Sequence, residues 1–182
     1  MQALVYLFTC VLVYLSTMSD KLKLALYWAA TCGGCDVAVL DTNEHLLDIA
    51  AAADIYLWPV ALDYKYKDAE AWPDGFIDVC LFNGAIRNSE NEHIAHLLRK
   101  KSKVLVAFGS CACFGGIPGL ANVANAAQVF DRVYHASPST VNPEGVTPQT
   151  TVTVPEGDLT LPHFNDTVRA LCQVEDVDYF LP

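Results

Sequence analysis

The residues of this chain best suited to chemistry are its cysteines, and two of them form the motif Cys32-Gly33-Gly34-Cys35. The two glycines between them allow the backbone to curl until both sulfur atoms face one point. Such a pair suits three kinds of chemistry: half of a zinc site, a thioredoxin-like dithiol, or half of an iron–sulfur site. The pair by itself does not choose among the three.

A second cysteine segment, Gly109-Ser110-Cys111-Ala112-Cys113, changes this balance. If the two segments meet, three or four thiolates converge, and a thioredoxin-like dithiol would leave the second segment unexplained. Zinc accepts four thiolates, but structural zinc usually organises small modules with little core of their own. An iron–sulfur cluster also explains the local glycines, because close backbone approach lets N–H groups tune the cluster. These glycines are Gly109, Gly115, Gly116 and Gly119.

The number and spacing of the cysteines argue against a secreted disulfide framework. The chain has seven of them, an odd number, at local, motif-like spacings. Metal or redox chemistry in a reducing, cytoplasmic compartment is therefore expected. Cys113 and Cys172 are alternative ligands, whereas Cys80 lies in the middle of an apolar run and is expected to be a small buried hydrophobe.

The elements that must position these cysteines alternate between strand and helix. Short apolar runs predict strands at 21–28, 54–60, 76–83, 104–108 and 176–181. Helical spacing of apolar residues predicts helices at 36–52, 89–101, about 121–134 and 164–172. This alternation predicts an α/β fold with a parallel sheet and helices on both faces. Ligands bind such sheets at the carboxyl ends of the strands, where both cysteine segments should emerge.

Two further features concern helix ends and connections. Ser89 is the predicted N-cap of helix 89–101, with Glu92 at capping-box spacing. Residues 61–75 are expected to form a polar, aromatic loop. Residues 135–163 hold five of the nine prolines and show little periodicity, so this stretch is either mobile or packed against a partner.

Composition limits the function classes. The 182 residues are 53% hydrophobic and 18% charged, which suits one folded domain. The formal net charge of -10 excludes a nucleic-acid partner, because nothing supplies a phosphate-neutralising surface.

The first 17 residues are treated apart from the domain at 18–182. They carry no charge, their apolar run is near the lower limit for a transmembrane helix, and no basic residue precedes it as in a secretory signal. Met18 opens a conventional start, so an upstream start codon is the preferred explanation of 1–17. A membrane-associated or cleaved segment is the alternative.

Three segments resemble the small, electron-transferring subunit of [NiFe] hydrogenases: YWAATCGGCD, FIDVCLFNGAIRNSENEH and VLVAFGSCACFGGIPGLAN. The resemblance extends from about Met18 to Pro182 and is nearest to the F420-non-reducing (methyl-viologen-reducing) branch, which works with heterodisulfide reductase in methanogenesis. The wider superfamily includes the 20 kDa-type subunit of respiratory complex I.

The resemblance implies a flavodoxin-like domain that holds a proximal [4Fe-4S] cluster. Cys32 and Cys35 match the first two family ligands, and Cys111 matches the third. The fourth lies in a Pro-Gly-Cys-Pro-Pro segment that would follow Pro182, so a C-terminally truncated chain without its ferredoxin-like region is expected. The cluster loops would contribute backbone at Gly33, Gly34, Gly109 and Gly115.

The implied function is electron transfer as part of a hydrogenase. Electrons would pass from the Ni-Fe centre of a separate large subunit, through the cluster, to a small iron–sulfur subunit and a heterodisulfide-reductase-type acceptor. The chain has no nickel-ligand motifs and would not be catalytic alone. The alternatives are a complex-I-like, cluster-bearing scaffold subunit and a thiol–disulfide oxidoreductase that uses Cys32 and Cys35.

Overall fold

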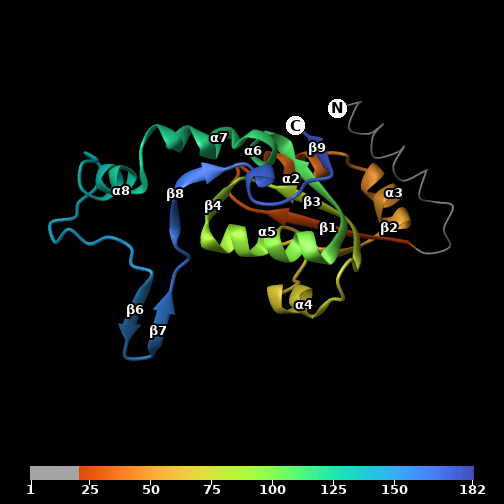
Figure 1. Ribbon diagram of the computed structural model, residues 1–182, viewed down its shortest axis with the longest axis horizontal. Helices are drawn as coiled ribbons and strands as arrows, with labels where there is room; N and C mark the ends of the chain where they lie inside the picture. Colours follow the sequence, from red (N-terminus) through yellow and green to blue (C-terminus); the bar gives the residue numbers. More distant parts are fainter. Residues whose placement is uncertain (1–20) are drawn as a thin grey trace.

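A central parallel sheet organises the computed structural model, which describes residues 21–182 (Figure 1). In spatial order its strands are β2 (Ala53–Leu57), β1 (Leu22–Trp28), β3 (Ile77–Asn83), β5 (Ser102–Phe108) and β9 (Tyr179–Leu181). This is the strand order of flavodoxin-like folds, in which ligands bind beyond the carboxyl ends of the strands. The predicted fold class and all five predicted strands are confirmed.

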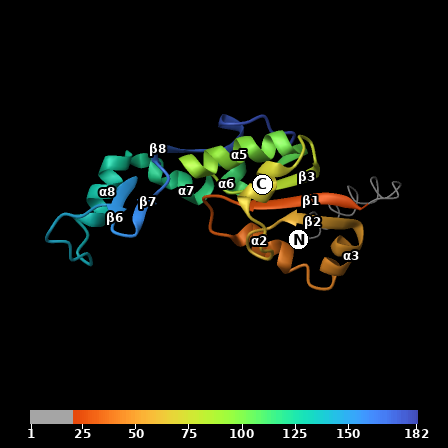
Figure 2. The same ribbon diagram turned by 90° about the horizontal axis from the view of Figure 1, so that it is seen from below.

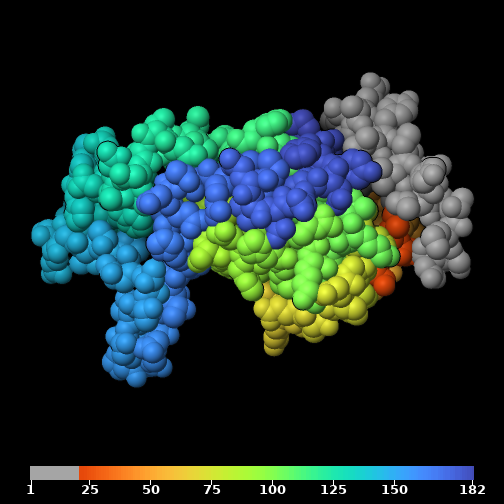
Figure 3. Space-filling view, viewed as in Figure 1, coloured from red at the N-terminus to blue at the C-terminus, as the bar shows by residue number. Residues whose placement is uncertain are grey.

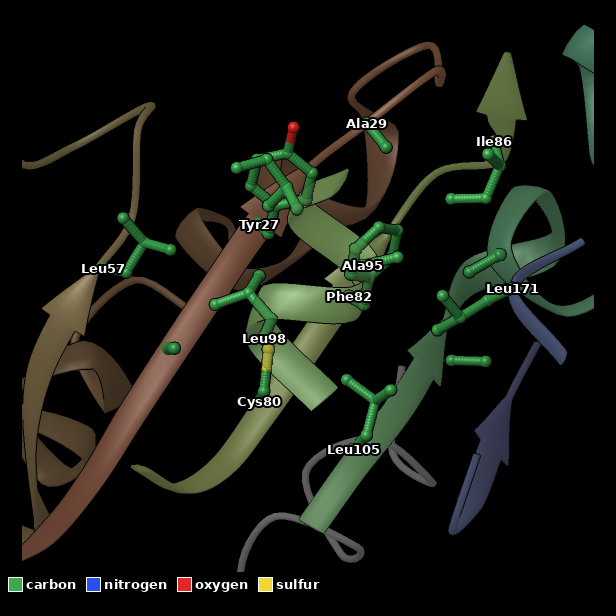
Figure 4. Close-up of a cluster of buried hydrophobic side chains, with 14 of the residues drawn as sticks. Tyr27, Ala29, Leu57, Cys80, Phe82, Ile86, Ala95, Leu98, Leu105 and Leu171 are labelled. Atoms are coloured by element: carbon green, nitrogen blue, oxygen red, sulfur yellow. The ribbon is translucent and has the colours of Figure 1, made fainter. Parts of the chain in front are cut away.

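Helices cover both faces of this sheet (Figure 2). Helix α5 (Ser89–Lys101) packs on one face, where Leu98 joins the sheet residues Phe82 and Leu105 in a buried cluster (Figure 4). Cys80 lies inside this cluster as a small hydrophobe, as expected, and burial raises the pKa of its thiol to about 12. Helices α2 (Gly34–Leu40) and α3 (His45–Ala52) pack on the other face.

The chain that leaves β1 is fastened to the chain that leaves β3. The Ala29 N–H donates to the Asn83 carbonyl at 2.8 Å, and the Ala85 N–H donates to the Ala30 carbonyl at 2.8 Å. Gly84 allows this approach, since a Cβ at this position would lie 2.8 Å from the Ala29 carbonyl carbon, and its φ of +107° favours glycine. These contacts fix where the first cysteine segment begins.

The helix predicted over 36–52 is in fact two helices, α2 and α3. The chain turns between them, where Asn43 has a φ of 52°. Thr42 Oγ1–H donates to the Val39 carbonyl at 2.7 Å, and Asn43 Nδ2–H donates to the Asp41 carbonyl at 3.0 Å. Short polar side chains that bond to nearby backbone in this way compete with helix continuation.

Other helices differ from prediction in their N-cap or in being present at all. Helix α5 has the predicted length, but its N-cap is Asn88 and not Ser89, since Asn88 Oδ1 accepts from the Asn91 N–H at 2.8 Å. Residues 61–75 contain α4 (Tyr66–Ala71). The glycine-rich segment after β5 is helical and forms α6 (Gly109–Phe114) and α7 (Gly116–Gly119).

The predicted helix at 164–172 is wrong. This segment forms β8 (Phe164–Arg169), antiparallel to the short strand β4 (Ile86–Asn88), and then the 3-10 helix η2 (Leu171–Gln173). The Arg87 guanidinium also lies 3.7 Å from the centre of the Phe164 ring. Pairing with a strand far away in the sequence therefore overrides the local pattern.

Residues 120–163 lead away from the sheet and return to it. They form η1 (Leu120–Val123), α8 (Ala126–Tyr134), and a hairpin of β6 (Thr151–Val154) and β7 (Gly157–Thr160) within the proline-rich stretch. The hairpin projects from the body of the molecule (Figure 3).

Two expectations concern the N-terminal segment and the membrane. The segment 1–17 lies outside the described residues. Among residues 21–182, no helix combines the length and the apolar character that a membrane crossing requires.

Asp178 joins the final segment to β5. Its Oδ2 accepts from Arg99 Nη1–H and from the Leu105 backbone N–H, both at 2.7 Å. The hydrogen bond from Arg99 holds the pKa of Asp178 below its usual value. A lowered folded-state pKa contributes stability above the unfolded pKa of about 3.9, and that contribution is lost as the pH falls through the folded pKa.

We therefore expect Asp178→Asn to lower the midpoint of urea unfolding at pH 7, and to lower it progressively less as the pH falls below about 4. Tryptophan fluorescence measures the midpoint. Asp176→Asn, at an exposed neighbouring residue, is the control and should leave the midpoint at pH 7 unchanged. An effect of Asp178→Asn that is equal at pH 7 and at pH 3 would contradict this explanation.

Candidate functional site

Both cysteine segments begin at the same edge of the sheet. Strands β1 and β5 pair in parallel with opposite sides of β3, so that Trp28 and Phe108 both align with Asn83. The first segment follows Trp28 after the three residues Ala29-Ala30-Thr31, and the second starts directly after Phe108. The predicted meeting of the two segments at the carboxyl ends of the strands is therefore confirmed.

The closest approach between the segments joins Cys35 and Gly109. A Cβ placed on Gly109 would lie 2.1 Å from Cys35 Sγ, and the φ of Gly109 is +83°. Only a residue without a side chain allows the Cys35 sulfur and the start of α6 to share this space. The two segments are thus in direct contact.

Cys111 lies against a glycine in the same manner. A Cβ on Gly116 would lie 2.7 Å from both Sγ and Cα of Cys111. Cys111 is buried, Cys35 is half-buried, and Cys32 is exposed. The three thiols therefore extend from the surface of the molecule into its interior.

The glycines expected around a cluster occupy positions where the local structure favours glycine, for a different reason at each. Gly33 has a φ of +82°, and a Cβ there would lie 2.5 Å from the Trp28 ring. Gly34 is the first residue of α2, where a Cβ would lie 3.4 Å from Cys32 Sγ. Gly115 has a φ of +89° and caps the end of α6. Their contact with a cluster stays a prediction.

The Cys35 thiol holds its proton more tightly than a free cysteine does. Burial, followed by the charges of Cys111 and Cys32, raises the pKa of the Cys35 thiol to about 11. A dithiol needs a thiolate at only one of its two cysteines, so this pKa leaves the thiol–disulfide alternative open. A ligand role requires only that metal binding displaces the proton.

The alternative ligands Cys113 and Cys172 have different surroundings. Cys113 is buried in the core on the α5 side, and its thiol donates to the Ala107 carbonyl at 3.3 Å. Cys172 is exposed on η2. Burial raises the pKa of the Cys113 thiol, and the charge of Cys172 raises it further.

Asp36 was foreseen only as an acid at the start of a helix, yet it is buried beside Cys35. Its Oδ1 accepts from Trp58 Nε1–H at 2.8 Å, and its Oδ2 accepts from Asn83 Nδ2–H. Its position directly after the Cys-x-x-Cys motif was the one sequence signal. The donors come from the end of β3 and from the residue that follows β2, and they were not predictable from the local pattern.

The donor set consists of cysteine thiols, which are the ligands of iron–sulfur clusters. Among residues 21–182, no three His, Cys, Asp or Glu side chains are grouped so as to hold one metal ion. In a [4Fe-4S] cluster each of four cysteines binds a different iron, so its ligands stand farther apart. Cys32, Cys35 and Cys111 have the chemistry of three of these four ligands, and their assignment to a cluster stays a prediction.

Comparison with known proteins shows the family of this chain. Residues 32–182 match the family described as NADH ubiquinone oxidoreductase, 20 Kd subunit. The iron-sulfur subunit of the F420-non-reducing hydrogenase of Archaeoglobus profundus is 47% identical over 161 residues, which are 88% of this chain and 50% of that protein. The corresponding hydrogenase subunit of Methanothermobacter marburgensis is 37% identical over 165 residues, 91% of this chain and 49% of that protein. The chain thus spans about half the length of these relatives.

A solved structure supports the same assignment. A chain from the crystal structure of an NAD+-reducing [NiFe]-hydrogenase in the H2-reduced state is similar, with a TM-score of 0.75 and 28% identity over 90% of this chain and 82% of that chain. The resemblance to small hydrogenase subunits of the F420-non-reducing branch is confirmed. With most of its residues matched, the chain belongs to the family of the 20 kDa subunit of NADH ubiquinone oxidoreductase.

Proposed function

We propose that this chain is the electron-transferring subunit of a [NiFe] hydrogenase, with Cys32, Cys35 and Cys111 as ligands of the proximal [4Fe-4S] cluster. The observation that carries the proposal is the contact of Cys35 Sγ with Gly109, which joins two cysteine segments far apart in the sequence. Hydrogenase names among the relatives support the reaction class.

The roles of the three thiols follow from their burial. A bound cluster supplies one-electron chemistry. Buried Cys111, half-buried Cys35 and exposed Cys32 would hold the cluster between the interior and the surface of the molecule. Each thiol releases its proton when it binds metal, which for Cys35 offsets the raised pKa.

We propose that the fourth ligand comes from the Pro-Gly-Cys-Pro-Pro segment that follows this region in the family. Strand β9 supports this, because Leu181 aligns with Phe108 in the parallel pairing of β9 with β5. A chain that continues past Pro182 would emerge at the same sheet edge as α6. The fourth thiol would then face the other three.

The proposed partner at this edge is the hydrogenase large subunit, which carries the Ni-Fe centre. Large apolar side chains are exposed around the cysteine segments, including Phe114 and Leu120, each 71% exposed, and Ile117 at 64%. These three residues follow one another at intervals of three along α6, α7 and η1, and exposed apolar side chains that gather in this way suit a protein interface. Electrons from H2 would enter through this interface, and the chain would not be catalytic alone.

The onward electron acceptors are inferred from the relatives, and the cellular location from the cysteines. We propose a small iron–sulfur subunit and heterodisulfide reductase as the onward acceptors, because the similar proteins are subunits of F420-non-reducing hydrogenases. A cytoplasmic location is proposed because the cysteines among residues 21–182 are free thiols. The formal net charge of -10 agrees with the absence of a nucleic-acid partner.

A complex-I-like scaffold subunit is the second candidate, favoured by the match of residues 32–182 to the 20 kDa subunit family. The two candidates share the cluster and differ in the partner. Nickel in the subunit that co-purifies with this chain supports the hydrogenase, whereas a nickel-free partner supports the scaffold.

Serine substitutions test the ligand set in the anaerobically purified native complex. We expect Cys111→Ser to remove the proximal cluster, with a loss of up to about four irons per chain, because serine does not replace a thiolate ligand well. Iron analysis and EPR of the reduced complex measure the loss. Cys172→Ser should retain the iron of the wild type. Equal iron in the Cys111→Ser and wild-type complexes would contradict the assignment.

Two glycines of one segment offer a matched test of the space around the thiols. Gly109→Ala should cost the cluster, because the new Cβ would occupy the position 2.1 Å from Cys35 Sγ. Gly119→Ala makes the same chemical change where a Cβ meets nothing within 4 Å, so the cluster should survive. Iron content and EPR intensity are compared between the two variants. A cluster that is intact in both would show that the close contact at Gly109 is not needed.

A further inference from the structure

Asp36 is a buried carboxylate without a cationic partner. The residue is 1% exposed, and none of the ion pairs among residues 21–182 includes it. Burying a charge is costly unless hydrogen bonds or an opposite charge compensate for it. Its two oxygens instead accept from two neutral N–H donors, on Trp58 and Asn83. This pattern suits the ionised carboxylate, which only accepts.

The two donors hold the carboxylate from separate elements. Trp58 follows β2, is itself buried, and donates from Nε1 at 2.8 Å. Asn83 is the last residue of β3 and is also buried. Since Asp36 lies in the first turn of α2, its carboxylate is clamped between that helix and the sheet.

The Asp36 carboxylate and its two donors lie directly beside the thiols. Asp36 follows Cys35 in the chain, and its charge contributes to the raised pKa of the Cys35 thiol. A Cβ placed on Gly109 would lie 2.1 Å from Cys35 Sγ. The same Cβ would lie 3.8 Å from Asn83 Oδ1. Asn83 therefore touches both the carboxylate and the space beside the Cys35 sulfur.

We propose that Asp36 is a positioning residue that lowers the reduction potential of the cluster. The inference rests on the proposed function and adds a role for a residue outside the ligand set. A fixed negative charge in a poorly screened interior opposes the arrival of an electron, and at an effective dielectric constant of about 20 this repulsion is substantial over several ångströms. Trp58 and Asn83 keep the charge in place without neutralising it.

The test is the midpoint potential of the EPR signal that Cys111→Ser removes. It is measured in the native complex by redox titration with dithionite as electron donor. Asp36→Asn removes the charge and keeps the shape, so the equilibrium constant for one-electron reduction should rise about tenfold, which corresponds to about +59 mV. A shift no larger than that of the control below would overturn the proposal.

The matched control is Asp78→Asn, at the opposite end of the same sheet. Asp78 lies near the start of β3 and accepts from the Lys23 N–H at 2.8 Å and from Lys103 Nζ at 2.6 Å. It is thus a hydrogen-bonded carboxylate on the strand that carries Asn83, but at the end of that strand away from Cys32, Cys35 and Cys111. This variant should leave the midpoint potential unchanged.

Trp58→Phe decides the question if Asp36→Asn assembles no cluster. It removes one donor and keeps the charge and an aromatic ring. The less compensated carboxylate should shift the potential in the negative direction, and an unchanged or raised potential would overturn the proposal.

If Cys111→Ser removes no EPR signal that the wild-type complex shows, the proposed function itself is contradicted. An unshifted potential in the Asp36 and Trp58 variants, with the signal present, contradicts only the role of Asp36.

Discussion

Parallel pairing of β1 and β5 with the two sides of β3 is the constraint on which the site depends. It places Trp28, Asn83 and Phe108 in one row across the sheet, so the segments that follow β1 and β5 start side by side. Strand β9 extends the row, because Leu181 aligns with Phe108. The thiols then need no long loops to meet. The apolar cores on both faces of the sheet hold this register, since a slip would move every buried side chain.

The apolar core offsets features of the site that lower the stability of the fold. Gly109 and Gly116 adopt positive φ values so that sulfur atoms can occupy space that a side chain would fill. Asp36 is buried with hydrogen bonds but without a cation. Glycines, which lose more entropy on folding than other residues, and a buried charge are each unfavourable for an isolated domain, and they gather at one edge of the sheet. Such departures from local rules are expected where function and not folding selects the residue.

The sheet was predictable from the sequence, because five short apolar runs are a strong signal of strands. The parallel topology then predicted that both cysteine segments lie at one edge of the sheet. It failed where distant contacts decide the structure. Residues 164–172 form a strand because β4 is available to pair with them. The helix over 36–52 is broken by side-chain bonds at Thr42 and Asn43. The hydrogen bonds to Asp36 were not predictable because their donors lie on segments remote in the sequence, whereas Cys111 as the proposed third ligand came from the family resemblance.

The central claim is that the carboxyl edge of the sheet holds an iron–sulfur cluster between the two cysteine segments. Anomalous diffraction at the iron absorption edge, on crystals of the anaerobically purified native complex, tests it most directly. The account predicts anomalous iron density within bonding reach of Cys32, Cys35 and Cys111. Iron density elsewhere in the complex with none at these three thiols, or a disulfide between Cys32 and Cys35 in their place, would contradict it.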